Sequence, residues 1–156
     1  MHVAQISTSY GLYGDSAIEI FVSGCKHGCE GCQNPQLWDF NHGLEMSVYE
    51  IVRFIDEKYG RNIPKFFDRF VMTGGDPLYS KEEVFELVKS LKATYHQQVW
   101  LYTGFTKEEI DVDDVMKEIF LLCDVVITDR FMKSFPPKKF AGSGNQRIWV
   151  DGVLSS

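Results

Sequence analysis

The sequence has no long apolar run, and residues 1–5 lack the basic segment followed by an apolar one that marks a secretory signal. A membrane-spanning helix needs about 20 consecutive apolar residues. Clustered thiols are most useful in a reducing compartment, because an oxidising one would pair them as disulfides. We therefore expect a soluble, cytoplasmic protein with no membrane partner.

Positive charge is also scarce. The chain has 16 Lys and Arg against 22 Asp and Glu, which gives a net charge of −6. A protein that follows a nucleic-acid backbone needs a basic face, so we expect no nucleic-acid partner. The richest basic stretch, residues 133–139, contains Lys138 and Lys139 next to Pro136-Pro137. We interpret it as a solvated loop, with a partner-binding loop as the alternative.

The length excludes a large multidomain protein. A chain of 156 residues is the size of one ordinary domain. Its 44% hydrophobic and 24% charged residues are typical of a globular protein with a buried core. We expect one domain that spans residues 1–156.

Cysteine is rare as well, yet three of the four cysteines, Cys25, Cys29 and Cys32, lie within eight residues. No apolar residue separates them, so they have no hydrophobic face to join. Thiolates gathered in this way favour zinc or an iron–sulfur cluster. The fourth, Cys123, lies in the apolar run 120–127, where a cysteine behaves as a small buried hydrophobe.

Three cysteines are one ligand short of a structural zinc site or of a ferredoxin cluster. A four-iron cluster held by three cysteines keeps one iron open to a small molecule, which suits a catalytic cluster. His27 and His42 are the histidines closest to the cysteines. We interpret His27 as a surface residue of the loop and His42, beside Gly43, as a turn residue rather than as zinc ligands.

Apolar strands alternate with amphipathic helices along the chain. Each predicted helix opens with a capping box and has one apolar face. The first predicted strand, residues 2–7, alternates only weakly and precedes a loop at Gly11 and Gly14. The predicted strands are residues 2–7, 17–22, 66–73, 99–102, 124–128 and 148–150. The capping pairs are Ser47 with Glu50, Ser80 with Glu83, and Thr106 with Glu109; the apolar faces are Val48, Ile51, Val52 and Ile55, then Val84, Leu87, Val88 and Leu91, then Val112, Val115, Met116 and Ile119.

This alternation predicts an α/β fold with a mainly parallel sheet and flanking helices. Because a closed barrel needs eight parallel strands, we expect a partial, open barrel. Parallel sheets bind ligands at the carboxyl ends of their strands. The segments that follow the strands are therefore expected to form one site: the cysteines, Gly74-Gly75-Asp76-Pro77, Thr103-Gly104 and Asp129-Arg130.

The Cys-x3-Cys-x2-Cys spacing of Cys25, Cys29 and Cys32, placed after an apolar strand, resembles the signature of radical S-adenosylmethionine (SAM) enzymes. Asn34-Pro35, Trp38 and the segment 142–147 are similar to the anaerobic ribonucleoside-triphosphate reductase activating proteins. The resemblance implies a radical SAM barrel and a 4Fe-4S cluster held by the three cysteines. It also implies that SAM chelates the fourth iron.

The resemblance further implies a set of SAM contacts. Gly31, Cys32 and Gln33 would flank the adenine through their backbones, although relatives often carry aromatic residues where Gly31 and Gln33 stand. Gly74 and Gly75 would present carbonyls to the amino group of SAM, with Asp76 helping to hold that edge. Thr103 and Asp129 would reach the ribose or carboxylate, with strand-end capping as the alternative. Arg147 would pair with a cofactor carboxylate, with a structural ion pair as the alternative.

The resemblance implies that an external one-electron donor, flavodoxin-like or other, reduces the cluster. SAM is then cleaved, and the 5′-deoxyadenosyl radical takes a hydrogen from a glycine of the partner reductase. The resemblance also implies either a homodimer or a hetero-tetramer with the reductase. The alternatives are an activase of another glycyl radical enzyme, a radical SAM enzyme acting on a small molecule, and a non-enzymatic zinc-binding interaction module.

Overall fold

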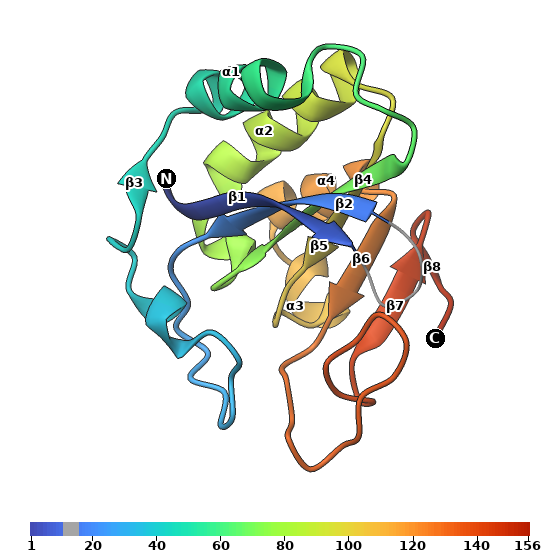
Figure 1. Cartoon of the computed structure of the whole chain (residues 1–156). Helices are drawn as coiled ribbons and strands as arrows, with labels where there is room; N and C mark the ends of the chain where they lie inside the picture. Colours follow the sequence, from blue (N-terminus) through green and yellow to red (C-terminus); the bar gives the residue numbers. More distant parts are fainter. Residues whose placement is uncertain (11–15) are drawn as a thin grey trace.

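A computed structural model describes residues 1–10 and 16–156, which form one α/β domain (Figure 1). The predicted loop at Gly11 and Gly14 lies outside these residues. The described residues form one eight-stranded sheet in the order β3-β1-β2-β4-β5-β6-β7-β8. The strands are β1 (His2–Tyr10), β2 (Ser16–Val22), β3 (Leu44–Glu45), β4 (Phe67–Gly74), β5 (Gln98–Tyr102), β6 (Val125–Thr128), β7 (Arg147–Val150) and β8 (Val153–Leu154).

The sheet is mixed. Strands β2, β4, β5 and β6 run parallel, as predicted, but β1, β3, β7 and β8 pair with their neighbours antiparallel. The prediction of a mainly parallel sheet is therefore right only for the centre. A parallel return needs a crossover, usually a helix. Since the 18 residues 129–146 between β6 and β7 contain no helix, the chain turns back beside β6 in the opposite direction.

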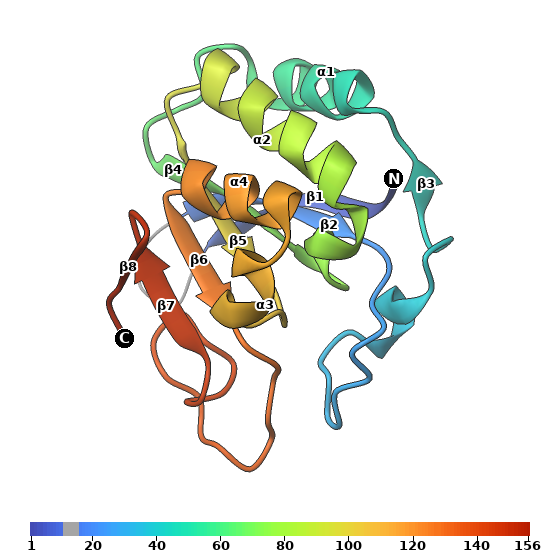
Figure 2. The same ribbon diagram turned by 180° about the vertical axis from the view of Figure 1, so that it is seen from behind.

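The four α-helices cover one face of the sheet, as Figure 2 shows. Their apolar stripes pack on the strand residues that point the same way, among them Ile18, Ile20, Phe70, Met72 and Leu101. We call this side the helical face. The helices are α1 (Val48–Tyr59), α2 (Lys81–Thr94), α3 (Lys107–Asp111) and α4 (Asp114–Leu122), and two short 3-10 helices are η1 (Pro35–Trp38) and η2 (Pro77–Ser80).

Two of the three predicted capping boxes form. Ser47 with Glu50 opens α1, and Thr106 with Glu109 opens α3. Ser80 makes no side-chain cap, because the chain enters α2 directly from η2 and Ser80 lacks the extended backbone of an N-cap. Its predicted partner Glu83 instead pairs with the N-terminal ammonium of Met1.

The third predicted helix is broken in two. The helix α3 ends at Asp111, and Asp113 caps α4, its carboxylate accepting from the backbone N–H of Met116 at 2.9 Å. Val112 falls at the break and is 87% exposed, so its assignment to the apolar face is wrong. Met116 and Ile119 are buried as predicted. No helix among the described residues is both long and apolar enough to cross a membrane.

The opposite side of the sheet, which we call the open face, carries no α-helix in the described residues (Figure 1). Alternation along the strands turns Ala17, Val71, Trp100 and Ile127 to this side. Over β5, β6 and β7 these residues and Tyr102 of β5 pack against Phe140 and Ala141 of the segment between β6 and β7. Over β2 and β4 the open face is hollowed into a pocket.

Candidate cofactor site

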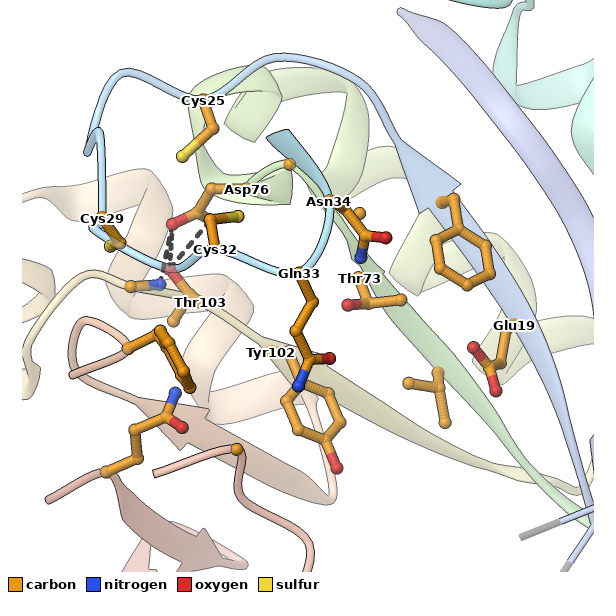
Figure 3. A pocket seen from close by; sticks show the side chains of 18 of the residues that line it. Glu19, Cys25, Cys29, Cys32, Gln33, Asn34, Thr73, Asp76, Tyr102 and Thr103 are labelled. Atoms are coloured by element: carbon orange, nitrogen blue, oxygen red, sulfur yellow. Dashed lines mark hydrogen bonds between the residues drawn. The ribbon is translucent and has the colours of Figure 1, made fainter. Parts of the chain in front are cut away.

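A cavity of about 620 Å³ lies on the open face and reaches the carboxyl ends of the parallel strands (Figure 3). It brings together most of the predicted site residues. Those that line it are Cys25, Cys29, Cys32, Gln33, Gly74, Gly75, Asp76, Thr103 and Asp129. Gly31 and Arg147 do not line it. The segments that follow β2, β4, β5 and β6 therefore meet at one pocket, as expected, and ligand binding there stays a prediction.

The cysteines lie on an irregular segment after β2, residues 24–33, which we call the cysteine loop. Figure 3 shows Cys25, Cys29 and Cys32 around the space beside Asp76. The backbone N–H of Gly24 donates to Leu37 O at 2.8 Å, and that of Cys32 donates to Cys29 O at 3.2 Å. These bonds fold the cysteine loop back on itself and against η1. Cys25, Cys29 and Cys32 therefore lie on one wall of the pocket.

The thiols are partly buried, which disfavours their charged form. Burial raises the pKa of Cys25 to about 11, with a smaller opposing effect from the backbone N–H of His27. Burial also raises the pKa of Cys29, opposed by the backbone N–H of Phe131. A metal ligates thiolate and releases the proton, so a bound metal centre reverses this preference.

The donors fit a multi-atom cluster better than a single ion. Among residues 1–10 and 16–156, no three His, Cys, Asp or Glu side chains converge as ligands of one metal ion. A zinc ion holds its thiolates about 2.3 Å from one centre. A four-iron cluster instead takes one cysteine per iron and occupies a larger space. Three thiols that share a pocket without meeting at one point suit the second arrangement.

The remaining cysteine is remote from this site. Cys123 follows α4, is buried in the core of the helical face, and has a pKa raised to about 12 by that burial. The prediction that it is a small core hydrophobe is confirmed.

Gly74 and Gly75 allow the chain to cross closely beneath the cysteine loop. Gly74 has φ +123°, and a Cβ there would lie 2.4 Å from Val22 O. A Cβ on Gly75 would lie 2.6 Å from Leu37 O and 2.7 Å from Gly24 O. The glycines are therefore required by chain-to-chain packing. Their predicted contact with SAM remains a prediction, and they do line the pocket.

Asp76 joins the strand ends. Its side chain is buried, and it accepts from the Leu78 N–H at 3.0 Å, the Thr103 hydroxyl at 2.9 Å and the Gly104 N–H at 2.8 Å. The expected role of Asp76 at the edge that would bind SAM stays a prediction. The Thr103 hydroxyl also accepts from the Phe105 N–H at 3.1 Å. These contacts support the strand-end alternative for Thr103.

The interpretation of His27 as a surface residue is wrong. Its side chain is only 4% exposed, and Nε2 lies 2.7 Å from Asp76 Oδ2. The ring packs on Tyr79 and Phe105, with centroids 5.1 and 4.7 Å away. Spacing within a loop carries no information on which side chain folds inward, so the sequence did not reveal this contact. His42 is exposed in a turn, as predicted.

Arg147 makes structural ion pairs. Its guanidinium donates to Asp129 at 2.8 Å and to Glu108 at 2.7 Å. Asp129 has φ +82° and also accepts from the Thr128 hydroxyl at 2.8 Å. The charged groups of Asp129 and Arg147 are therefore paired with each other. This supports the alternative that Arg147 forms a structural ion pair.

The segment 142–147 fixes the chain that leaves β6. The amide of Gln146 donates to Asp129 O at 3.1 Å, and that of Asn145 donates to Arg130 O at 2.9 Å. The Ser143 hydroxyl accepts from the Met132 N–H at 3.1 Å. The motif noticed in the sequence therefore shapes the pocket wall that faces the cysteine loop.

Sequence reasoning missed the polar wall of the pocket. Glu19, Asn34, Thr73 and Tyr102 line it. Figure 3 shows Asn34, Thr73 and Glu19 beyond Gln33 on the side away from Cys29, and Tyr102 next to Gln33. For two of these residues, the sequence contains a pattern that could have predicted a place in the pocket. Glu19 interrupts the apolar strand 17–22 and Thr73 ends the next one, at alternate positions that point to the open face.

Comparisons with known proteins agree with this geometry. The family described as 4Fe-4S single cluster domain matches residues 14–149. The anaerobic ribonucleoside-triphosphate reductase-activating protein of Enterobacteria phage T4 is 35% identical over 87% of this chain and 86% of its own length. Proteins of the same name from Pasteurella multocida and Escherichia coli K12 are 31% and 26% identical, each over 83% of this chain and 84% of their own. The chain belongs to the family of anaerobic ribonucleoside-triphosphate reductase-activating proteins.

Proposed function

We propose that this protein activates an anaerobic ribonucleoside-triphosphate reductase by forming a glycyl radical on it. The observation that carries the proposal is the placement of Cys25, Cys29 and Cys32 around one pocket, next to the Gly74-Gly75 turn, in a chain of this family. When bound there, a 4Fe-4S cluster and SAM supply the electron and the 5′-deoxyadenosyl radical that takes a hydrogen atom from a glycine of the reductase.

The residues of the chain bind and orient these groups. The three thiolates would hold the cluster, and with no fourth cysteine nearby one iron would be left for the amino and carboxylate groups of SAM. Backbone carbonyls at Gly74 and Gly75 would accept hydrogen bonds from that amino group. The backbones of Gly31, Cys32 and Gln33 would flank the adenine.

The pocket walls separate the reacting groups from water. The aromatic rings of Phe131, Tyr102 and Phe140 form a border on the side of β5 and β6, with the Tyr102 hydroxyl bonded to Phe140 O. A reactive carbon radical needs such a border because it abstracts hydrogen from whatever it meets first. Asp129 is held in the pocket wall by its ion pair with Arg147, and Thr103 holds Asp76 there through a hydrogen bond.

The partner enters from the open face. We propose that the sheet is the open form of a radical SAM barrel, in which α-helices cover only the outside. A glycine-bearing segment of the reductase then reaches the pocket across β2 and β4. The protein works in the reducing cytoplasm with an external one-electron donor, as a homodimer or a hetero-tetramer with the reductase.

The test is anaerobic reconstitution with iron and sulfide, followed by electron paramagnetic resonance (EPR) of the reduced protein with and without SAM. We expect a reduced-cluster signal that changes when SAM is added, because SAM occupies the open iron. Adding the reductase should then produce a glycyl radical only when SAM and a reductant are both present. A colourless zinc-containing protein, or a cluster signal indifferent to SAM, would refute the proposal.

A further inference from the structure

His27 lies in the middle of the cysteine loop, between Cys25 and Cys29, yet its ring points away from solvent into the protein. Backbone hydrogen bonds hold the loop at Gly24, Cys25 and Cys32, and Glu30 pairs with Lys133. The loop nevertheless has no regular secondary structure, and Gly28 and Gly31 have φ of +64° and +79°. Each residue of such a loop loses conformational entropy when it is fixed, so an anchor inside it reduces the cost of ordering the thiols.

The seat for the His27 ring is built by the ends of β4 and β5. Asp76 Oδ2 lies 2.7 Å from Nε2, and Gly104 lies so close that a Cβ there would come within 2.7 Å of the ring. Tyr79 and Phe105 pack on the ring, and the Tyr79 hydroxyl is 3.3 Å from Nδ1. Both ring nitrogens of His27 therefore have a polar partner, the Asp76 carboxylate at Nε2 and the Tyr79 hydroxyl at Nδ1.

Asp76 fixes the position of His27 rather than the reverse. Asp76 is 1% exposed and is held by three other donors: Leu78 N–H, the Thr103 hydroxyl and Gly104 N–H. Losing one of its four donors leaves the carboxylate in place. His27, in contrast, has Asp76 as its strongest polar partner, so the loop depends on the contact more than the strand ends do.

We propose that His27 is a positioning residue that anchors the cysteine loop on Asp76, so that Cys25, Cys29 and Cys32 are kept on the pocket wall for the cluster. The inference rests on the proposed cluster at these cysteines. The anchor consists of protein groups alone, so it acts before iron is bound as well as afterwards. Residues that orient metal ligands in this way typically change metal affinity by about 10-fold to 100-fold.

The first experiment compares three variants for retention of a reconstituted cluster against a chelator. His27→Leu keeps an apolar side chain in the seat but removes the donor, and we expect it to lose iron about tenfold faster than the wild type. His27→Gln places an amide donor near Asp76 and should restore most of the retention. His42→Leu, the matched control, makes the same change at a histidine exposed in a turn outside this seat and should behave as the wild type.

The second experiment needs neither a cluster nor activity. In the metal-free protein, the reaction rate of each cysteine with a thiol reagent is followed by mass spectrometry. We expect His27→Leu to speed modification of Cys25, Cys29 and Cys32, while Cys123 stays unreactive because it is buried behind the sheet. His27→Gln should return the rates towards those of the wild type.

The outcomes separate this inference from the proposed function. Unchanged thiol rates and unchanged iron retention in His27→Leu would overturn the anchor. If Cys123 becomes reactive together with the other three, the substitution acts through the whole fold, and the positioning role is also wrong. If the wild type itself takes up no cluster while the thiol rates still respond to His27→Leu, the proposed function fails and the anchor stands.

Discussion

The two faces of the sheet are built by different means. The helical face is a continuous apolar core in which α1, α2 and α4 pack on every second residue of the central strands. The open face has a smaller apolar cluster and is completed by loops that hold one another through hydrogen bonds and ion pairs. The same strands thus serve two purposes, stability on one side and ligand binding on the other.

This difference has an energetic consequence. Burial of apolar area supplies most of the free energy of folding, at about 25 cal/mol per Å². Polar contacts on the open face add little net stability, because water offers the unfolded chain similar partners. We therefore expect substitutions on the open face to alter the chemistry of the pocket and leave the free energy of unfolding nearly constant. Substitutions on the helical face should lower the free energy of unfolding and leave the chemistry of the pocket unchanged.

The largest expected effect is at the cysteines. Replacing Cys25, Cys29 or Cys32 by Ala removes one of three cluster ligands, and we expect reductive cleavage of SAM to be abolished. Cys123→Ala, on the helical face, should retain it. The measurement is formation of 5′-deoxyadenosine from SAM by the reconstituted, reduced protein.

The metal-free proteins provide the control. Because Cys25, Cys29 and Cys32 are only partly buried, their replacement should change the free energy of unfolding by less than about 1 kcal/mol. An active Cys29→Ala protein would contradict the cluster assignment. A strongly destabilised one would contradict the separation of the two faces.

A smaller effect, on stability, is expected at Leu87. This residue of α2 is fully buried in the helical core, and truncation of such a leucine leaves a cavity. Leu87→Ala should lower the free energy of unfolding by about 2–5 kcal/mol, measured by urea denaturation. Gln33→Ala, at an exposed position that lines the pocket, should change it by less than about 0.5 kcal/mol.

The division between the faces would fail if Leu87→Ala, at a temperature where it is folded, altered the EPR response of the cluster to SAM. It would also fail if Gln33→Ala destabilised the protein as much as Leu87→Ala does.

What the sequence predicts follows the same division. The apolar residues of α1 and α2 repeat with the period of a helix, and the central strands are short apolar runs, so the helical face could be predicted position by position. The break at Asp113 was missed, because an aspartate inside a periodic pattern resembles an exposed helix residue. Only the structure shows that its carboxylate caps the next turn.

The sequence predicted which segments meet at the site but not which side chains contact one another there. Strand ends are visible in the sequence, so the segments that meet in the pocket were found. The partners of individual side chains were not, since they join residues far apart in the chain. His27 meets Asp76 49 residues away, and Arg147 meets Glu108 39 residues away. No local period encodes such pairs.

The smallest expected effect concerns an ion pair at the border of the open face, where Arg130, which follows β6, meets Glu109 of α3. The hydrogen bond from Arg130 lowers the pKa of Glu109 from its ordinary 4.5 to about 2. A carboxyl group with a depressed folded pKa stabilises the fold above its ordinary pKa, and the effect is lost as the pH falls from 4.5 towards 2. Because the Glu109 side chain is 42% exposed, solvent screening reduces the contribution to below about 1 kcal/mol.

Glu109→Gln isolates this charge, because glutamine serves equally well at the third position of the capping box that opens α3. Urea denaturation of both proteins should show the variant slightly less stable than the wild type at neutral pH. The difference should disappear as the pH falls from 4.5 towards 2, where the wild-type carboxylate also loses its charge. A difference that stays constant across that window would place the effect in the cap rather than in the ion pair, and would show that this loop of the open face is held without help from charge.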